Sequence, residues 1–442
     1  MELTGKLSGI YAVDRITSKR TEYSESSPAK IRDDISSILT RAAAINDASS
    51  DLVRNIIDVL NSKGGIIARS ITEDTGKAIS ASRKEIAAAL KVLRDHIKVK
   101  EADRADGSRI AYRSGISIVY PDVWCPVLSL VERLVPALHT RKLQVVSTDS
   151  RAFTAVKMLL DEIDPLTALK AGLVVSLFAA QTKTVSIMQR KRISDLLFSG
   201  SMEELSKLTH RCDCCSVRAE SGEGFSIMVA EDSKLDECAV SIADIFLDFS
   251  RSPFRRPATV LVEASVEEYL ENRLIEEISK HNTGDPLSES TSVGFVQNPE
   301  NASTAAAILL SGKNRTHDIL HWDGFQDNVF HPALVKDASA SSRLRGFNDL
   351  PILKMRNMAS IQDGFDQVVQ SGNLMFASIW SSDPYLEELV SQALPVSSIY
   401  FNLVPSVLPA EWKNPLVNEN VIQGPGALIK SMLSQKTLLR RK

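Results

Sequence analysis

Residues 116–146 read Ile116-Ser-Ile-Val-Tyr-Pro-Asp-Val-Trp-Cys-Pro-Val-Leu-Ser-Leu-Val-Glu-Arg-Leu-Val-Pro-Ala-Leu-His-Thr-Arg-Lys-Leu-Gln-Val-Val146. Two short apolar runs, residues 116–120 and 143–146, have the length and bounds of buried strands. Between them, apolar residues recur at helical spacing from Val127 to Leu138. A strand, a helix and a second strand in this order predict one unit of a parallel α/β sheet.

The alternation of strands and helices continues outward from this stretch. Upstream, apolar residues at helical spacing predict helices over residues 29–46, 49–62 and 79–99, with Gly64-Gly65 and Gly76 as interruptions. Downstream, apolar strand-like runs at 173–178 and 196–198 complete the first series. A second alternation runs from residue 226 to residue 401. The sequence therefore predicts an α/β fold with two doubly wound α/β domains.

Length and composition set limits on the function. The chain has 442 residues, 43% of them hydrophobic and 24% charged, which is typical of a globular protein of two or more domains. A net charge of −3 gives no reason to expect nucleic acid or an anionic membrane as a partner. No apolar run reaches the roughly 18 residues that a membrane span needs, and the N-terminus has no signal-peptide core. Five cysteines do not form a disulfide framework in so long a chain, so we expect a cytoplasmic protein.

A set of short motifs resembles the aldehyde dehydrogenase family. The motifs follow one another at the family's spacing between residues 28 and 402: Glu73-Asp-Thr-Gly-Lys, Leu134-Val-Pro-Ala-Leu, Phe198-Ser-Gly-Ser, Asp232-Ser-Lys-Leu-Asp-Glu, Pro257-Ala-Thr-Val-Leu-Val, Gly284-Asp-Pro-Leu and Ile399-Tyr-Phe-Asn. The resemblance implies a domain division that the chain shares with the family. It consists of a dinucleotide-binding-like, Rossmann-type domain over 1–102 and 114–222, a catalytic-like domain over 223–424, and oligomerisation strands over 103–113 and 425–442.

The resemblance also implies a catalytic position, and its residue differs here. In the family a cysteine thiolate attacks the aldehyde before hydride leaves for the nicotinamide. The match places Phe254 at that position, and a benzyl side chain has no lone pair to donate. The family's asparagine oxyanion donor is matched by Trp124, whose bulk favours filling the substrate space. The resemblance therefore predicts a scaffold without the oxidation chemistry.

The residues matched to the family's dinucleotide site are also altered. The lysine and glutamate that hold the adenosine ribose are replaced by Ser147 and Ser150, which removes charge-assisted hydrogen bonds. Gly200 and Ser201 survive at the turn that opens the helix facing the pyrophosphate. The second glycine of that helix is Leu205.

The nicotinamide end of the site is altered in the same way. Arg345 replaces the glutamate that would hold the nicotinamide ribose, two residues before Phe347. NAD or NADP therefore remains a candidate ligand of a degenerate site, and no cofactor is firmly expected.

One catalytic group of the family persists. Glu220 matches the general base, and a carboxylate in a partly apolar site can act as a base or an acid. The alternative interpretation, left open, is an inherited residue that is now hydrogen-bonded to the backbone.

Metal-ligand patterns are weak. The segment His210-Arg-Cys212-Asp-Cys214-Cys215 lacks the spacing of a zinc ribbon, and a redox-sensitive thiol pair is the better interpretation. His317 and His321 have the one-turn spacing of helical ligands but no third partner, so a solvated helix face is expected. No metal is predicted.

Three functional hypotheses follow. The first is a pseudoenzyme that serves as an assembly or regulatory partner, as a homodimer or as a hetero-oligomer with a homologue. The second is a repurposed enzyme that performs non-redox acid–base chemistry on a small metabolite, with Glu220 as the acid or base. The third is a residual NAD(P)-dependent dehydrogenase with another thiol, for which Cys125 is the candidate. The sequence favours the first slightly and does not decide between the first two.

Overall fold

The computed structural model describes most of the chain, in two compact units. Unit 1 comprises residues 1–221 and 410–431, and unit 2 comprises residues 222–409 and 432–442. The described residues are 10–13, 20–23, 49–103, 116–138, 143–175, 193–209, 216–221, 224–311, 317–337, 344, 346–371, 376–396, 398–404, 420–422 and 437–440.

Unit 1 is built on a six-stranded sheet with the order β17-β7-β6-β3-β4-β5. Strands β3 to β7 are parallel to their neighbours, and β17 pairs antiparallel with β7 at the edge. Because β4 and β5 lie on one side of β3, and β6 and β7 on the other, the direction of winding reverses at β3. The strands are β3 (Ile116–Tyr120), β4 (Leu143–Val146), β5 (Leu173–Val175), β6 (Ile193–Gly200), β7 (Ser216–Ser221) and β17 (Asn420–Ile422).

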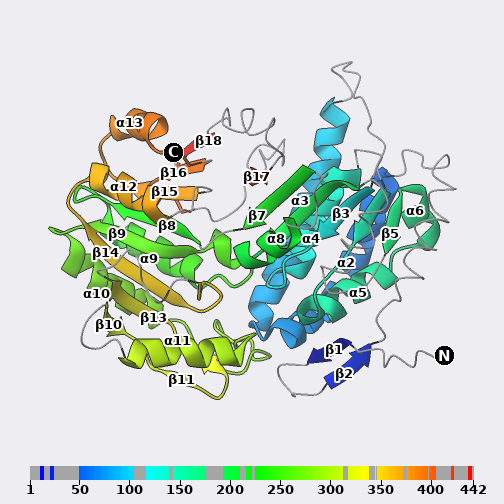
Figure 1. Cartoon of the computed structure of the whole chain (residues 1–442), viewed down its shortest axis with the longest axis horizontal. Coiled ribbons are helices and arrows are strands. Elements are labelled where there is room, and N and C mark those ends of the chain that lie inside the picture. The colour runs from blue at the N-terminus through cyan, green and yellow to red at the C-terminus, as the bar shows by residue number, and fades with distance from the viewer. Residues whose placement is uncertain are drawn as a thin grey trace, which may run out of the picture. The chain divides into compact units, whose positions relative to one another are not determined.

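Helices cover the sheet of unit 1, as Figure 1 shows in blue, cyan and green. They are α2 (Ser49–Thr75), α3 (Ile79–Asp103), α4 (Pro126–Leu138), the 3₁₀ turn η3 (Ser150–Ala152), α5 (Phe153–Asp161), α6 (Pro165–Lys170) and α8 (Met202–Thr209). A hairpin of β1 (Ile10–Val13) and β2 (Arg20–Tyr23) belongs to the same unit.

The predicted interruption of the N-terminal helix at Gly64-Gly65 is wrong, whereas that at Gly76 is confirmed. Helix α2 runs through both glycines. A Cβ at Gly64 would lie only 3.1 Å from Ile86 Cγ2 of α3, so the glycine lets the two helices pack closely, and this packing outweighs the low helix propensity of glycine. Gly76 has φ +79° and donates its N–H to Thr72 O at 2.8 Å, which ends the helix.

The core of unit 1 has two parts, one on each face of the sheet. Alternate side chains of β3 serve both: Val119 packs with α2–α5, and Ile118 and Tyr120 pack with residues of β6 and α8. Burial on both faces explains why the strands read as continuous apolar runs.

Unit 2 contains an eight-stranded sheet with the order β10-β13-β14-β9-β8-β15-β16-β18. All pairs are parallel except β10 with β13. The strands are β8 (Phe225–Val229), β9 (Pro257–Glu263), β10 (His317–His321), β13 (Ala333–Asp337), β14 (Ile352–Met358), β15 (Phe376–Trp380), β16 (Ser398–Phe401) and β18 (Thr437–Arg440). A separate two-stranded ladder joins β11 (Phe325–Gln326) to β12 (Val329–Phe330).

The helices of unit 2 bury two apolar clusters against its sheet. Residues of α12 and α13 pack with β8, β9, β15 and β16, and residues of α11 pack with β13. The helices are α9 (Leu235–Phe246), the 3₁₀ turn η4 (Pro253–Arg255), α10 (Glu267–Ile278), α11 (Pro299–Ser311), α12 (Ile361–Ser371) and α13 (Leu386–Ala393). The expected α/β fold with parallel sheets is thus confirmed.

One detail differs from the sequence-based expectation. His317–His321 is the edge strand β10 and not a helix face, because its backbone pairs with β13. The two C-terminal strands join different sheets: β17 joins the sheet of unit 1, and β18, within the predicted 425–442 tail, joins that of unit 2. The predicted domain boundary at residue 424 stays a prediction. Residues 104–113, predicted as oligomerisation strands, lie outside the described residues, while Asp103 ends α3. No helix in the described parts of the chain is long and apolar enough to cross a membrane.

Candidate functional site

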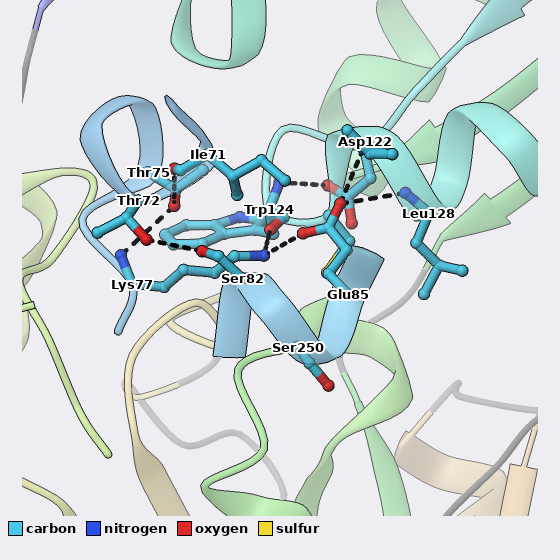
Figure 2. Close-up of polar contacts among 12 residues, drawn as sticks. Ile71, Thr72, Thr75, Lys77, Ser82, Glu85, Asp122, Trp124, Leu128 and Ser250 are labelled. Carbon is cyan, nitrogen blue, oxygen red and sulfur yellow. Dashed lines mark hydrogen bonds and ion pairs between the residues drawn. The ribbon is translucent and has the colours of Figure 1, made fainter. Parts of the chain in front are cut away.

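The lysine of the Glu73-Asp-Thr-Gly-Lys motif lies in the interior of unit 1 (Figure 2). Lys77 follows the turn that ends α2 and forms an ion pair with Glu85 of α3, with side chains 2% and 0% exposed. Its Nζ also donates to Trp124 O at 2.8 Å. Burial lowers the pKa of Lys77, but its interactions with Glu85, Cys125 and Asp122 outweigh this effect, so the pKa is raised. The ammonium therefore stays charged and holds its partners.

Glu85 connects this lysine to the first turn of α4. Its Oε1 accepts the backbone N–H groups of Val127 at 2.8 Å and Leu128 at 3.1 Å. A carboxylate at a helix N-terminus satisfies donors that have no partner within the helix and interacts favourably with the helix dipole. The Lys77–Glu85 pair therefore fixes the start of α4 and the residues just before it.

Trp124 lies in that fixed segment. The backbone N–H of Trp124 donates to Asp122 Oδ1 at 3.1 Å, and its backbone carbonyl accepts from Lys77 Nζ. The indole is partly buried against the core formed by the helices of unit 1. Both peptide groups of Trp124 are thus held in place (Figure 2). Its predicted role as the replacement of an oxyanion donor stays a prediction.

Cys125, the thiol of the third hypothesis, is buried. Its side chain is 1% exposed and belongs to the apolar core of unit 1, while its carbonyl accepts from Ser129 Oγ at 2.7 Å. The Lys77 ammonium interacts with this thiol electrostatically, so its burial, and not a lack of charged neighbours, is what keeps an aldehyde from it.

Glu220 forms an ion pair with Arg133, which projects from α4. Glu220 lies next to the end of β7, and the two side chains are 1% and 2% exposed. A buried carboxylate and a buried guanidinium in contact hold each other in place, because breaking such a pair in the interior of a protein is costly. The arrangement therefore holds the Glu220 carboxylate in place. To act as a base, Glu220 would first have to break its ion pair with Arg133.

The residues matched to the nucleotide site surround the ends of β4 and β6 in unit 1. Ser147 is fully buried directly after β4, and its N–H donates to Val119 O at 3.0 Å. Ser150 begins η3, Gly200 ends β6, and Ser201 precedes α8. The structure therefore brings these four residues of the predicted site to the carboxyl ends of the strands.

The fit of a dinucleotide phosphate to these strand ends is poor. A Cβ built on Gly200 would lie 2.8 Å from Phe198 Cζ and 3.1 Å from Glu204 Oε2, so a ring of β6 and a carboxylate of α8 already occupy the space beside the glycine. A phosphate that approached the same turn would meet a carboxylate of like charge.

Phe254 lies in unit 2, in the 3₁₀ turn η4 that precedes β9. Its side chain is 3% exposed, and the Arg255 guanidinium carbon lies 5.9 Å from its ring centroid. The neighbouring Arg256 is buried and donates to the carbonyl of Asn348 at 3.0 Å.

Arg256 thereby joins the segment of Phe254 to the segment of Phe347. Phe347 packs at the margin of the α11 cluster, and Arg345 lies outside the described residues. The structure thus brings together two of the sequence-predicted segments of unit 2.

Metal binding finds no support in the part of the chain that the structure describes. No group of three or more His, Cys, Asp or Glu side chains suited to a metal ion occurs there. His210, Cys212, Cys214 and Cys215 lie outside the described residues, so the prediction about these thiols is not addressed.

Several residues at these positions were not singled out from the sequence: Lys77, Glu85, Arg133, Asp149, Arg151 and Glu204. The sequence does indicate a buried charge at Arg133, because this arginine interrupts the apolar run Leu130-Val-Glu-Arg-Leu-Val of a helix that packs on a sheet. Glu204 also did, since Ser201 and Glu204 have the spacing of a capping box.

The profile of the aldehyde dehydrogenase family matches residues 46–412 of the chain. Among curated proteins, a lactaldehyde dehydrogenase of Methanococcus vannielii is 24% identical over 325 residues, 69% of each chain. A lactaldehyde dehydrogenase of Methanococcus maripaludis is 22% identical over 377 residues, which is 80% of this chain and 79% of that protein.

Solved structures with similar folds cover nearly the whole chain. Aldehyde dehydrogenase 21 from Physcomitrella patens, in complex with the product succinate, has a TM-score of 0.80 at 14% identity and covers 91% of this chain and 88% of its own. A NAD-dependent benzaldehyde dehydrogenase from Corynebacterium glutamicum has a TM-score of 0.78 at 16% identity, with 92% and 93% covered. A glyceraldehyde-3-phosphate dehydrogenase from Methanocaldococcus jannaschii, solved with NADP, has a TM-score of 0.77 at 14% identity, with 90% and 91% covered.

Proposed function

Because the chain belongs to the aldehyde dehydrogenase family, we propose that it keeps the family scaffold and has lost NAD-dependent aldehyde oxidation. In this proposal it is a pseudoenzyme that acts as an assembly or regulatory partner. The observation that carries the proposal is Phe254, which stands at the matched nucleophile position and is 3% exposed. A buried benzene ring neither attacks a carbonyl carbon nor carries a thiohemiacetal.

The state of Glu220 supports the proposal. General-base catalysis needs a carboxylate that can reach and accept a substrate proton. Here the carboxylate is 1% exposed and paired with Arg133. Separating the two would break a buried ion pair, and the loss of one partner of such a pair costs about 3–5 kcal/mol.

The burial of Cys125 supports it as well. An aldehyde has to reach the sulfur before any oxidation, and this thiol is 1% exposed within the core of unit 1. We therefore rank a residual dehydrogenase that uses Cys125 last.

In the alternative hypothesis, the chain is a repurposed enzyme with Glu220 as its acid or base. It requires acid–base chemistry on a small metabolite, without a nicotinamide. Under this alternative, Glu220→Gln abolishes conversion of the substrate at a temperature where the variant is still folded. Full conversion by the folded variant rules out Glu220 as the base.

The proposed partners are a second copy of this chain or a family homologue, in the cytoplasm. Copurification after coexpression with an active homologue tests the second, and sedimentation of the pure protein tests the first. An assembly role predicts a stable complex in at least one of these experiments, and a monomer that binds no homologue contradicts it.

Turnover is the decisive measurement. The pure chain is assayed for NADH and NADPH release with a panel of aldehydes that includes lactaldehyde and benzaldehyde, beside an active aldehyde dehydrogenase as a positive control. We expect no release above the enzyme-free rate. Reproducible release that scales with protein concentration overturns the proposal.

A further inference from the structure

Helix α8 begins with a carboxylate of its own in the place where an incoming anion would bind. Ser201 is its N-cap: Ser201 Oγ accepts the N–H of Glu204 at 3.2 Å, and Ser201 N–H donates to Glu204 Oε2 at 3.3 Å. Ser201 Oγ also donates to Glu204 Oε2 at 3.2 Å. This reciprocal capping box uses the donors that a helix N-terminus otherwise presents to a phosphate.

The other oxygen of the same carboxylate is engaged by Arg151 from η3. Arg151 Nη2 donates to Glu204 Oε1 at 2.6 Å, while Arg151 Nε donates to Asp149 Oδ1 at 2.9 Å. Asp149 Oδ1 also accepts the backbone N–H of Arg151 at 2.9 Å. The guanidinium is therefore held by Asp149 through Nε and by Glu204 through Nη2. The three side chains are 23–35% exposed, so the network is partly shielded from water.

The network spans the reversal point of the sheet in unit 1. Arg151 follows β4 and Glu204 follows β6, and these strands lie on either side of β3. In open α/β sheets a ligand binds beyond the carboxyl ends of the strands where the winding reverses. The Arg151–Glu204 pair therefore crosses the position at which a dinucleotide would be held.

Gly200 adds a steric argument. It has φ +157°, and a glycine at such a turn usually lets a ligand phosphate approach the backbone. Here a Cβ on Gly200 would lie 2.8 Å from Phe198 Cζ and 3.1 Å from Glu204 Oε2, so the Phe198 ring and the Glu204 carboxylate together occupy the space beside the glycine.

We propose that Glu204, held by Ser201 and Arg151, is an internal substitute for the dinucleotide pyrophosphate and excludes NAD and NADP from unit 1. This deepens the proposed function, because it names the contact that excludes the cofactor. It does not depend on the absence of a nucleophile.

The test measures the affinity of the full chain for NAD, NADP and ADP-ribose by isothermal titration calorimetry. Glu204→Gln keeps the side-chain length and removes the charge, and Glu204→Ala also removes the bulk of the side chain, while the Phe198 ring stays beside Gly200. Glu203→Gln is the matched control: it removes the same charge from the same helical turn, but Glu203 is exposed and pairs with Lys207.

We expect the wild type and Glu203→Gln to bind weakly and alike. The two Glu204 variants should bind at least one of the dinucleotides about tenfold more tightly or better, since removing a like charge at an anion site is worth more than about 1.4 kcal/mol. Thermal unfolding in the presence of ligand gives a second readout, because tighter binding raises the melting temperature.

Two results overturn the inference. One is micromolar binding of NAD or NADP by the wild type. The other is equal affinity of wild type and both Glu204 variants. Tight NAD or NADP binding by the wild type without NADH release would overturn the inference and leave the pseudoenzyme proposal in place. The opposite combination would reject the pseudoenzyme and retain the inference: the wild type binds weakly and releases NADH slowly, and its Glu204 variants bind better.

Discussion

Arg133 and Glu220, 87 residues apart in the sequence, form an ion pair in the interior of unit 1 that joins α4 to β7. Neither charge is exposed to solvent by more than 2%. Removing one partner breaks this buried ion pair, which is among the more costly single changes in a protein.

The pair gives a first prediction. Arg133→Met and Glu220→Gln should each lower the free energy of unfolding by about 3–5 kcal/mol. The double variant should lose less than the sum, because no lone charge remains. Chemical denaturation of the four proteins measures this cycle. Lys207→Met, at an exposed position, should change stability by no more than about 0.5 kcal/mol; additive effects in the cycle would show that the pair is not coupled.

A second prediction concerns pH. Asp74, in the last turn of α2, accepts the N–H of Ala155 of α5 at 3.0 Å, and burial raises the pKa of its carboxyl from 3.8 to about 7. Because the folded-state pKa lies above the unfolded value, the contribution of Asp74 to stability is fully present below about pH 4 and is lost as pH rises through about 7.

Asp74→Asn should remove this loss. An amide oxygen still accepts from Ala155 but carries no charge, so the variant should be more stable than wild type at pH 8, by up to a few kcal/mol, and similar at pH 4. Thermal unfolding at both pH values measures the difference. Asp58→Asn, on the exposed face of the same helix, should follow the wild type at both. A constant difference between Asp74→Asn and wild type would contradict the assignment.

A third prediction compares two adjacent glycines in α2. A methyl group at Gly65 meets nothing within 4 Å, so Gly65→Ala should stabilise the protein by about 1 kcal/mol through helix propensity alone. At Gly64 the new methyl would lie 3.1 Å from Ile86 Cγ2, and the contact should cancel this gain or reverse its sign. Denaturation midpoints of the two variants give the comparison, and equal stabilisation by both would show that α2 and α3 are not closely packed at Gly64.

Periodicity predicts most elements because strands such as β3, β4 and β8 are buried along their whole length and therefore read as short apolar runs. Ile116–Tyr120, Leu143–Val146 and Ile79–Asp103 were found in this way. The helix through Gly64-Gly65 was missed because tertiary packing against Ile86 overrides the low helix propensity of glycine. The edge strand at His317–His321 was missed because two histidines four residues apart suggest a helix, whereas the pairing with β13 is a long-range contact.

The candidate site was predicted only in part. Phe254, Trp124 and Gly200 follow from matching motifs, and the structure gives their surroundings. The partners that define the electrostatics, Arg133 and Arg151, come from other elements, and no local pattern announces such long-range ion pairs.

The course of the C-terminal segments limits how the protein can be divided. The chain leaves unit 1 after Ser221, returns to supply β17, and leaves again to supply β18. A fragment cut at residue 221 would expose the edge of β7, and a fragment cut before residue 432 would expose the edge of β16. Bare parallel-sheet edges recruit other chains, so truncation libraries of this protein should yield aggregates unless the missing strand is added back as a separate peptide.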